Sequence, residues 1–441
     1  MPPVLHLTPQ EVDTPEKRQK FRVAVVGCGR KGIFYSNAFA DAGFNVICTD
    51  ADASVVKKVA KGKTAFGMPE VEAKLKKHIA NEKIDVTGEL KKAVAQSDII
   101  VVAITAKAND QKKNDFASLV NTCKQIGAAL HQGTLVIYGG IAGLDFMEGT
   151  LKELLENTSG FKVGADFALA YSPLIDTSAS PADLELWVAA TDQTSLQAAV
   201  AILGTLSRHI REVGSLKTAE AAAIFTVARQ DVATALTNEL AVFCETASID
   251  YFKVLDALDL NNPSFRPKIA QEENSEAYLL LEGAENLNAK LKIATLARQI
   301  NEDMVKHAVN LTHEGLRSCG KTLRRGKVAV LGALNPPSDT GCFVKLLEQK
   351  GAKVTIYDPT AKKGTQDSEV VKTSLNEAIE GADCLVVLSA KEQFNHLNLK
   401  KLKALMKSPS AVVDLVGKFE PTQVDTEGFI YRGLGRGFEQ K

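Results

Sequence analysis

The sequence predicts an α/β protein in which two doubly wound α/β domains are joined by a central helical domain. Short apolar strands alternate with helical segments over the first part of the chain, and the same alternation returns near its end. Such alternation is typical of parallel sheets covered by helices. Between these parts the strand patterns disappear and long helical periodicity replaces them. We therefore expect domains at 20–195, 196–320 and 321–441.

The first predicted domain begins with "FRVAVVGCGRKGIFYSNAFADAGFNVICTDAD" (21–52), which we interpret as strand, glycine-rich turn, helix and strand. Its first apolar run, Val23 to Val26, is β-branched and continuous, as in a strand buried on both faces. Further strands are expected within 97–105, 133–140 and 166–173, and a helix near 113–130.

The central domain contains "AEAAAIFTVARQDVATALTNELAVFCE" (219–245), whose apolar pattern predicts a buried helix. A polar stretch at 258–276 interrupts the helical region. The last domain then repeats the α/β pattern, with strands expected in "GKVAVLG", "KVTIYDP", "ADCLVVLSA" and "AVVDLVG".

The charge and composition exclude several classes of protein. Lys plus Arg equals Asp plus Glu at 53 each, so a basic face for nucleic acid is not expected, whereas one small anionic ligand remains possible. The seven cysteines have no metal-ligand spacing, which indicates reduced thiols in the cytoplasm and no metal site. No apolar run is long enough to cross a membrane, and no signal peptide is evident.

The glycine-rich turn is the main candidate for a binding site. Gly27, Gly29 and Gly32 form G-x-G-x-x-G between the strand and the helix, a pattern that allows a tight turn and close approach of a pyrophosphate to the helix N-terminus. Asp50 ends the next strand, where a carboxylate accepts hydrogen bonds from a ribose and repels a 2′-phosphate. The pattern therefore predicts NAD rather than NADP. The alternative is the same fold with an empty or repurposed site.

Two basic residues of the turn, Arg30 and Lys31, are also candidate cofactor-binding residues, and their charge could weaken the preference for NAD. The last α/β domain lacks G-x-G-x-x-G in "VLGALNPPSDTG". We therefore expect two Rossmann-like domains, of which only the first holds a dinucleotide by this motif.

The three-part layout resembles the UDP-glucose/GDP-mannose dehydrogenase family over roughly 21–437. The matching pieces are "VAVVGCGRKG", "SGFKVGADFALAYSP", "TAE" with "TNELA", "GKVAVLG" with "LLEQKGAKVTIYDP", "GADCLVVLSAKEQF" and "GFIYRGLGRG". The resemblance implies NAD in the first domain, a homodimer through the central helices and a nucleotide sugar at the last domain. It also implies oxidation of a sugar C6 alcohol to a carboxylate in two hydride transfers.

The residues that the family uses for this oxidation are replaced here. Aligned on the family's motifs, the lysine and asparagine of the central helix correspond to Ala223 and Val227, and the nucleophilic thiol corresponds to Phe265. One acid corresponds to Ile269, and the glutamate of a Ser-Pro-Glu motif corresponds to Leu174. A general base and an oxyanion donor each contribute roughly 10² to 10⁴ in rate, so the resemblance predicts a member impaired in this reaction.

Three hypotheses remain open. The chain is a non-catalytic relative that keeps dinucleotide binding and dimerisation, an NAD-dependent oxidoreductase that makes one hydride transfer on another alcohol, or a working dehydrogenase with a relocated thiol. Asp231 is a weak catalytic candidate, although a structural ion pair is the more common role for such a residue. Lys268 is the second weak candidate, because its charge could hold an anion. Glu220 is interpreted as a charge that caps the first turn of its helix.

Overall fold

The computed structural model describes residues 4–108, 114–177, 180–260, 262–269, 276–332, 339–357, 370–388 and 397–437. They fall into two compact units. The first unit comprises Met1–Ala228 and Ser275–Lys290, and the second comprises Arg229–Asn274 and Leu291–Lys441. The region predicted as one central domain is therefore divided between the two units.

The first unit is built on an eight-stranded sheet with the order β10-β9-β8-β7-β4-β1-β2-β3. Its strands are β1 (Arg22–Val26), β2 (Asn45–Thr49), β3 (Ile84–Thr87), β4 (Ile99–Val102), β7 (Leu135–Tyr138), β8 (Ala168–Tyr171), β9 (Glu185–Ala190) and β10 (His209–Glu212). All neighbours are parallel except β8 and β9. The sheet thus continues past residue 195, where the first domain was expected to end.

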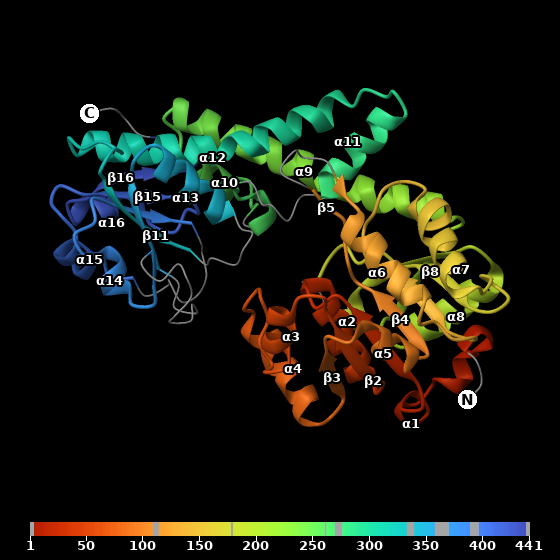
Figure 1. The fold of residues 1–441 in the computed structure, drawn as a ribbon. Helices are drawn as coiled ribbons and strands as arrows, with labels where there is room; N and C mark the ends of the chain where they lie inside the picture. Colours follow the sequence, from red (N-terminus) through yellow and green to blue (C-terminus); the bar gives the residue numbers. More distant parts are fainter. Residues whose placement is uncertain are drawn as a thin grey trace. The chain divides into compact units, whose positions relative to one another are not determined.

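Helices pack on both faces of this sheet (Figure 1). They are α2 (Arg30–Ala42), α3 (Ala53–Val59), α4 (Pro69–Ala80), α5 (Leu90–Ala95), α6 (Ala117–Gly127), α7 (Glu153–Ser159) and α8 (Gln193–Leu203). Another helix of this unit, α11 (Ala277–Asn286), belongs to a separate apolar cluster with Ile224 and Val227. A π-helix, Met147–Lys152, precedes α7. A short antiparallel pair, β5 (Lys107–Ala108) with β6 (Asn114–Asp115), lies outside the main sheet.

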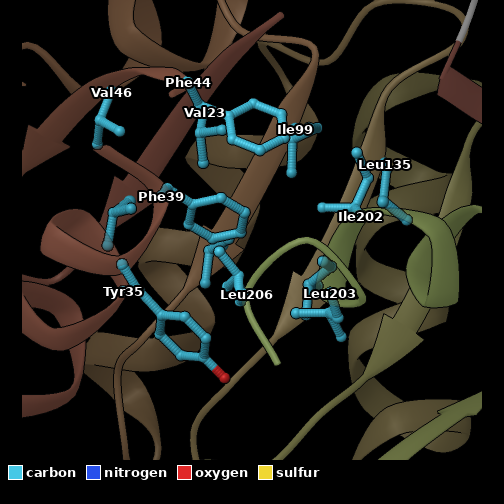
Figure 2. Packing of buried hydrophobic residues seen from close by; sticks show 14 of the residues in the cluster. Val23, Tyr35, Phe39, Phe44, Val46, Ile99, Leu135, Ile202, Leu203 and Leu206 are labelled. Carbon is cyan, nitrogen blue, oxygen red and sulfur yellow. The ribbon is translucent and has the colours of Figure 1, made fainter. Parts of the chain in front are cut away.

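The β-branched strands divide the apolar core into two layers. Val23 and Val25 of β1 point into one layer, while Ala24 and Val26 point into the other, since successive side chains of a strand alternate. Figure 2 shows the first layer, where Phe39 of α2 lies between Val23 and Tyr35. This burial on both faces explains the continuous apolar runs in the sequence.

The predicted buried helix is α9 (Leu216–Thr246), and the boundary between the units falls within it. In the second unit the chain continues with α10 (Tyr251–Ala257), a 3₁₀ turn at Pro263–Phe265 and α12 (Lys292–Ser318). None of the helices among the described residues combines the length and apolar character needed to cross a membrane.

The second unit contains a six-stranded parallel sheet with the order β13-β12-β11-β14-β15-β16. Its strands are β11 (Lys327–Leu331), β12 (Lys353–Tyr357), β13 (Val371–Lys372), β14 (Cys384–Val387), β15 (Ala411–Asp414) and β16 (Ile430–Gly433). Its other helices are α13 (Asp339–Gln349), α14 (Leu375–Ile379), α15 (Leu399–Leu405) and α16 (Pro421–Thr426). Two Rossmann-like sheets, the first parallel except for one pair and the second parallel throughout, with helices between them in sequence, confirm the predicted fold class. Most of the "ALNPPSD" segment lies outside the described residues.

Candidate functional site

The glycine-rich turn connects β1 to α2 as the motif predicts. A Cβ on Gly27, whose φ is +100°, would lie 2.9 Å from Ile104, and a Cβ on Gly32 would lie 1.7 Å from the Gly27 carbonyl oxygen. Gly29 caps the N-terminus of α2, and a Cβ there would meet no atom within 4 Å. The fold thus requires glycine at two positions, while the third leaves open space where a ligand can approach the backbone.

Asp50 follows β2 and holds the turn in place. Its carboxylate accepts the backbone N–H of Cys28 at 2.7 Å and that of Asp52 at 2.9 Å. Because an ionised carboxylate has about four acceptor sites, two remain for other donors such as ribose hydroxyls. Asp50 therefore has a structural role that the sequence motif does not reveal, and it is half-buried rather than enclosed.

The turn lies at the point where the strand order reverses. β1 has β2 on one side and β4 on the other, so the chain first winds toward β3 and then toward β7 and β8. In doubly wound folds a dinucleotide binds across the carboxyl ends of the strands at such a point. The open space at Gly29 and the remaining acceptor sites of Asp50 fit a dinucleotide here.

Arg30 and Lys31 point to different partners. The Arg30 guanidinium lies 5.1 Å from the centre of the Phe66 ring. The Lys31 Nζ lies 2.9 Å from an oxygen of Glu276 and 3.3 Å from the Thr105 hydroxyl. Glu276 could not be predicted as a partner of Lys31, because 245 residues separate the two in sequence.

Three of the replaced family positions lie in the first unit, and all three are buried. Ala223, Val227 and Leu174 are 0%, 7% and 1% exposed. Ala223 and Val227 are one turn apart on the same helix, and Leu174 comes three residues after β8 ends. None of these side chains carries a group that can transfer a proton or stabilise an oxyanion.

The other two replaced positions lie in the second unit, on the segment after α10. Phe265 is 40% exposed, whereas Ile269 is 9% exposed and packs in the core of the second unit. The backbone N–H of Lys268 donates to the Asn238 side chain at 2.8 Å, and the Tyr251 hydroxyl donates to the Phe265 carbonyl at 3.1 Å. The segment is thus attached to α9 and α10, and the Lys268 side chain is half-buried.

Asp231 is a structural residue in this arrangement. It is 4% exposed, and its carboxylate lies 3.0 Å from the Arg298 guanidinium and 2.9 Å from the Asn301 amide nitrogen. Asn301 also accepts from Asn238. A buried carboxylate with these partners is not available to a substrate, so the geometry does not support Asp231 as a catalytic base.

Glu220 does not cap its own helix, in contrast to the sequence expectation. Its carboxylate accepts the backbone N–H of Asp145 at 2.9 Å and that of Met147 at 2.7 Å. It therefore caps the helix that starts at Met147. Burial raises the pKa of Glu220 to about 7, although both N–H donors favour the charged form. Within the described residues, no three His, Cys, Asp or Glu side chains are grouped as a metal site would require.

Comparison with known proteins matches two parts of the chain to two domains of one family. Residues 21–180 match the NAD binding domain of the UDP-glucose/GDP-mannose dehydrogenase family, and residues 338–421 match the UDP binding domain of that family. The cofactor of the chain is therefore NAD, in agreement with the prediction from the glycine-rich turn.

Two curated relatives extend over nearly the whole chain. The UDP-N-acetyl-D-mannosamine dehydrogenase of Pyrococcus horikoshii is 26% identical, with 94% of this chain and 99% of the relative covered. The UDP-glucose 6-dehydrogenase of Rhizobium meliloti is 22% identical over the same shares. A solved structure of UDP-D-ManNAc dehydrogenase from P. horikoshii has the same fold, with a TM-score of 0.80, 23% identity and coverage of 94% of this chain and 99% of that chain. The chain belongs to the UDP-glucose/GDP-mannose dehydrogenase family.

Proposed function

We propose that this chain is a family member that holds NAD in its first unit and is impaired in the thiol-dependent oxidation of a sugar C6 alcohol to a carboxylate. The observation that carries the proposal is the set of apolar side chains at the five aligned catalytic positions. Four of them, Ala223, Val227, Leu174 and Ile269, are buried.

The proposed impairment follows from what the reaction requires. Oxidation of an alcohol needs a base that accepts its proton while hydride leaves. The aldehyde that results needs a nucleophile before it can give up a second hydride, and a thiolate is the group that the family resemblance implies. Phe265 offers neither function, and Ala223 offers no cation for an oxyanion.

In this proposal the chain's own residues still bind and orient the dinucleotide. The first turn of α2 presents backbone N–H groups that the helix cannot satisfy, and these suit the pyrophosphate. Asp50 accepts from the ribose hydroxyls with its remaining acceptor sites. Bound NAD supplies a hydride acceptor.

A second candidate is an NAD-dependent oxidoreductase that makes a single hydride transfer on a different alcohol. One observation favours it: Lys31 and Glu276 are ionisable and lie together at the carboxyl edge of the first sheet. Asp231, the residue that the sequence offered for this role, is enclosed by Arg298 and Asn301.

A binding and turnover panel separates these candidates. Thermal stabilisation would be followed with NAD, NADP, UDP-glucose, UDP-N-acetylmannosamine and GDP-mannose, and NADH absorbance would be read in the same wells. The sugar nucleotides are chosen from the names of the family and of the two relatives. We expect stabilisation by NAD and no NADH with any of these sugars.

The other outcomes are equally clear. Further wells hold NAD with simple alcohols, and one NADH per alcohol molecule there would support the second candidate. Two NADH per sugar nucleotide, lost after thiol alkylation, would overturn the proposed impairment and point to a relocated thiol. A lack of stabilisation by NAD would contradict the cofactor assignment itself.

We further propose that the chain forms a homodimer through the helices of its second unit. Leu236, Leu240 and Phe243 follow one stripe of α9 and are 56%, 46% and 62% exposed. Ile293 and Leu296 of α12 are 72% and 57% exposed. Exposed apolar stripes of this kind are typical of protein interfaces. The family resemblance makes a second copy of this chain the expected occupant.

Light scattering coupled to size exclusion tests the dimer. Phe243→Glu should convert the wild-type dimer to a monomer, whereas Glu239→Gln, an exposed change on the same helix, should leave the mass unchanged. A monomeric wild type would contradict the proposal. We also propose a cytoplasmic location, because the structure describes all seven cysteines and none of them forms a disulfide.

A further inference from the structure

The ion pair between Lys31 and Glu276 occupies a particular place in the first unit. Lys31 belongs to the first turn of α2, and Glu276 is the residue before α11. Their charged atoms are 2.9 Å apart, and their side chains are only 17% and 18% exposed. Lys31 also reaches Thr105, three residues after β4 ends. The pair therefore lies over the carboxyl ends of β1 and β4, at the point where the strand order reverses.

The charge of Glu276 affects two buried tyrosines at the ends of β7 and β8, on one side of the point where the strand order reverses. Tyr138 and Tyr171 are the last residues of these strands, and their rings stack with centres 5.8 Å apart. Burial raises the pKa of both phenols well above the usual value, and the charge of Glu276 raises it further. The Tyr138 and Tyr171 hydroxyls have no hydrogen-bond partner among the described residues. An uncompensated charge would act strongly among these buried groups.

The fold assigns the two halves of a dinucleotide to opposite sides of the reversal point. Asp50 follows β2, so the adenosine ribose lies on the β2 side. The nicotinamide half must then extend toward β4 and β7, where Lys31 and Glu276 lie. The nicotinamide ring carries a positive charge in NAD⁺ and none in NADH, while the rest of the cofactor is the same. A fixed charge on this side thus acts differently on the two forms.

We propose that Lys31 and Glu276 act in opposite directions on the affinity of the protein for NAD⁺ relative to NADH, and that their pairing keeps the two effects in balance. The Glu276 carboxylate favours the cationic ring, and the Lys31 ammonium opposes it, so the intact pair is nearly balanced. This inference deepens the proposed function, because it rests on NAD binding in the first unit. It requires no turnover and no identified substrate.

Calorimetric titration with NAD⁺ and with NADH at low, fixed ionic strength tests the proposal. Glu276→Gln leaves the Lys31 charge unbalanced, so the ratio of the Kd for NAD⁺ to the Kd for NADH should rise, on the order of threefold to tenfold. Lys31→Met leaves the Glu276 charge unbalanced, so the same ratio should fall by a similar factor. In the double variant the ratio should return to within about twofold of the wild type.

The ratio separates this role from a simpler one. A lysine that only contacts the pyrophosphate would change both affinities equally, because both forms carry the same phosphates. Glu156→Gln is the matched control, since Glu156 pairs with Lys162 at 3.0 Å in the same unit but precedes the amino end of β8. Its ratio should equal that of the wild type.

Each result bears on the proposal. Opposite shifts in the two single variants support it. An unchanged ratio in both, with NADH still bound, overturns it and leaves the cofactor assignment intact. If the wild type binds neither form, the cofactor assignment fails and the inference fails with it. Should one variant not fold, the sign of the shift in the other decides.

Discussion

The Glu220 carboxylate on α9 accepts the backbone N–H of Met147 at 2.7 Å, although 73 residues separate the two in sequence. Its second oxygen accepts the N–H of Asp145, which has a φ of +61°. Glu220 therefore fixes the start of the π-helix Met147–Lys152 and attaches it to α9. This explains a carboxylate that is 3% exposed in an otherwise apolar part of the helix.

The first prediction is a pH dependence of stability that comes from Glu220. Its pKa rises from an ordinary value of 4.5 to about 7 in the fold. A raised pKa in the folded state contributes stability that is fully present below pH 4.5 and is lost as the pH rises to about 7. The loss should be roughly 3 kcal/mol in the free energy of unfolding. Urea unfolding measured from pH 4 to 8 checks this slope.

Glu220→Gln should remove this part of the slope, because an amide does not titrate in that range. Glu153→Gln on α7 is an exposed change of the same chemistry and should keep the wild-type slope. Equal slopes in Glu220→Gln and the wild type would show that the buried carboxyl does not titrate between these pH values.

The second prediction separates the structural and ligand-binding glycines of the turn. Gly32→Ala should destabilise the protein by several kcal/mol, on the order of a severe core clash, because its Cβ would lie 1.7 Å from the Gly27 carbonyl oxygen. Gly29→Ala should change stability by less than about 1 kcal/mol, because its Cβ meets nothing within 4 Å and its φ is −73°.

Gly29→Ala should change the affinity for NAD strongly, although it changes stability little. A methyl group there projects into the space where the pyrophosphate approaches the backbone, so the Kd for NAD should rise at least about tenfold. Thermal unfolding and calorimetric titration measure the two effects on the same samples. A Gly29→Ala protein that binds NAD normally would show that the pyrophosphate does not pass over this residue.

The third prediction concerns the buried ion pair between Asp231 and Arg298. Asp231→Asn should cost about 3 to 5 kcal/mol of unfolding free energy, because it removes the negative charge that lies 3.0 Å from the buried Arg298 guanidinium. The double variant Asp231→Asn/Arg298→Met should recover part of this loss. Urea unfolding of the single and double variants measures the coupling, and a stable single variant that loses only turnover would instead support a catalytic Asp231.

Much of the fold could be predicted because its central strands are continuous β-branched runs. β1, β4 and β7 are buried on both faces and leave the same signature in the sequence. β10 left no such signature, because "HIRE" is a mostly exposed edge strand with only one apolar residue. β10 is a strand because it pairs with β9, and the order of its own apolar and polar residues does not indicate this.

The site was predictable only where its residues are close in sequence. The glycine-rich turn and Asp50 lie within one βαβ unit, and local geometry relates them. Lys31 and Glu276, by contrast, meet only after the chain has left the first unit and returned to it at Ser275. Asp231 and Arg298 come from two different helices in the same way. No periodicity or motif relates such pairs.

The last prediction concerns the C-terminal tail of the second unit. Arg436 forms an ion pair with Asp250, the N-cap of α10, and its guanidinium lies 4.4 Å from the centre of the Phe252 ring. The adjacent Gly435 donates its N–H to Glu245 of α9 at 2.7 Å. These contacts attach the end of the chain to the helices that carry the proposed dimer surface.

Arg436→Met should therefore destabilise the second unit by about 3 kcal/mol, because Asp250 loses its partner in a setting where Arg436 is 6% exposed. Arg436→Lys keeps the charge but not the planar group that stacks on Phe252, so it should recover only part of the loss.

If the tail also holds the helices in position for dimerisation, Arg436→Met should raise the dimer dissociation constant, whereas Arg324→Met, outside this cluster, should not. Urea unfolding and sedimentation equilibrium measure both effects. A dimer unaffected in a destabilised Arg436→Met protein would confine the role of the tail to local stability.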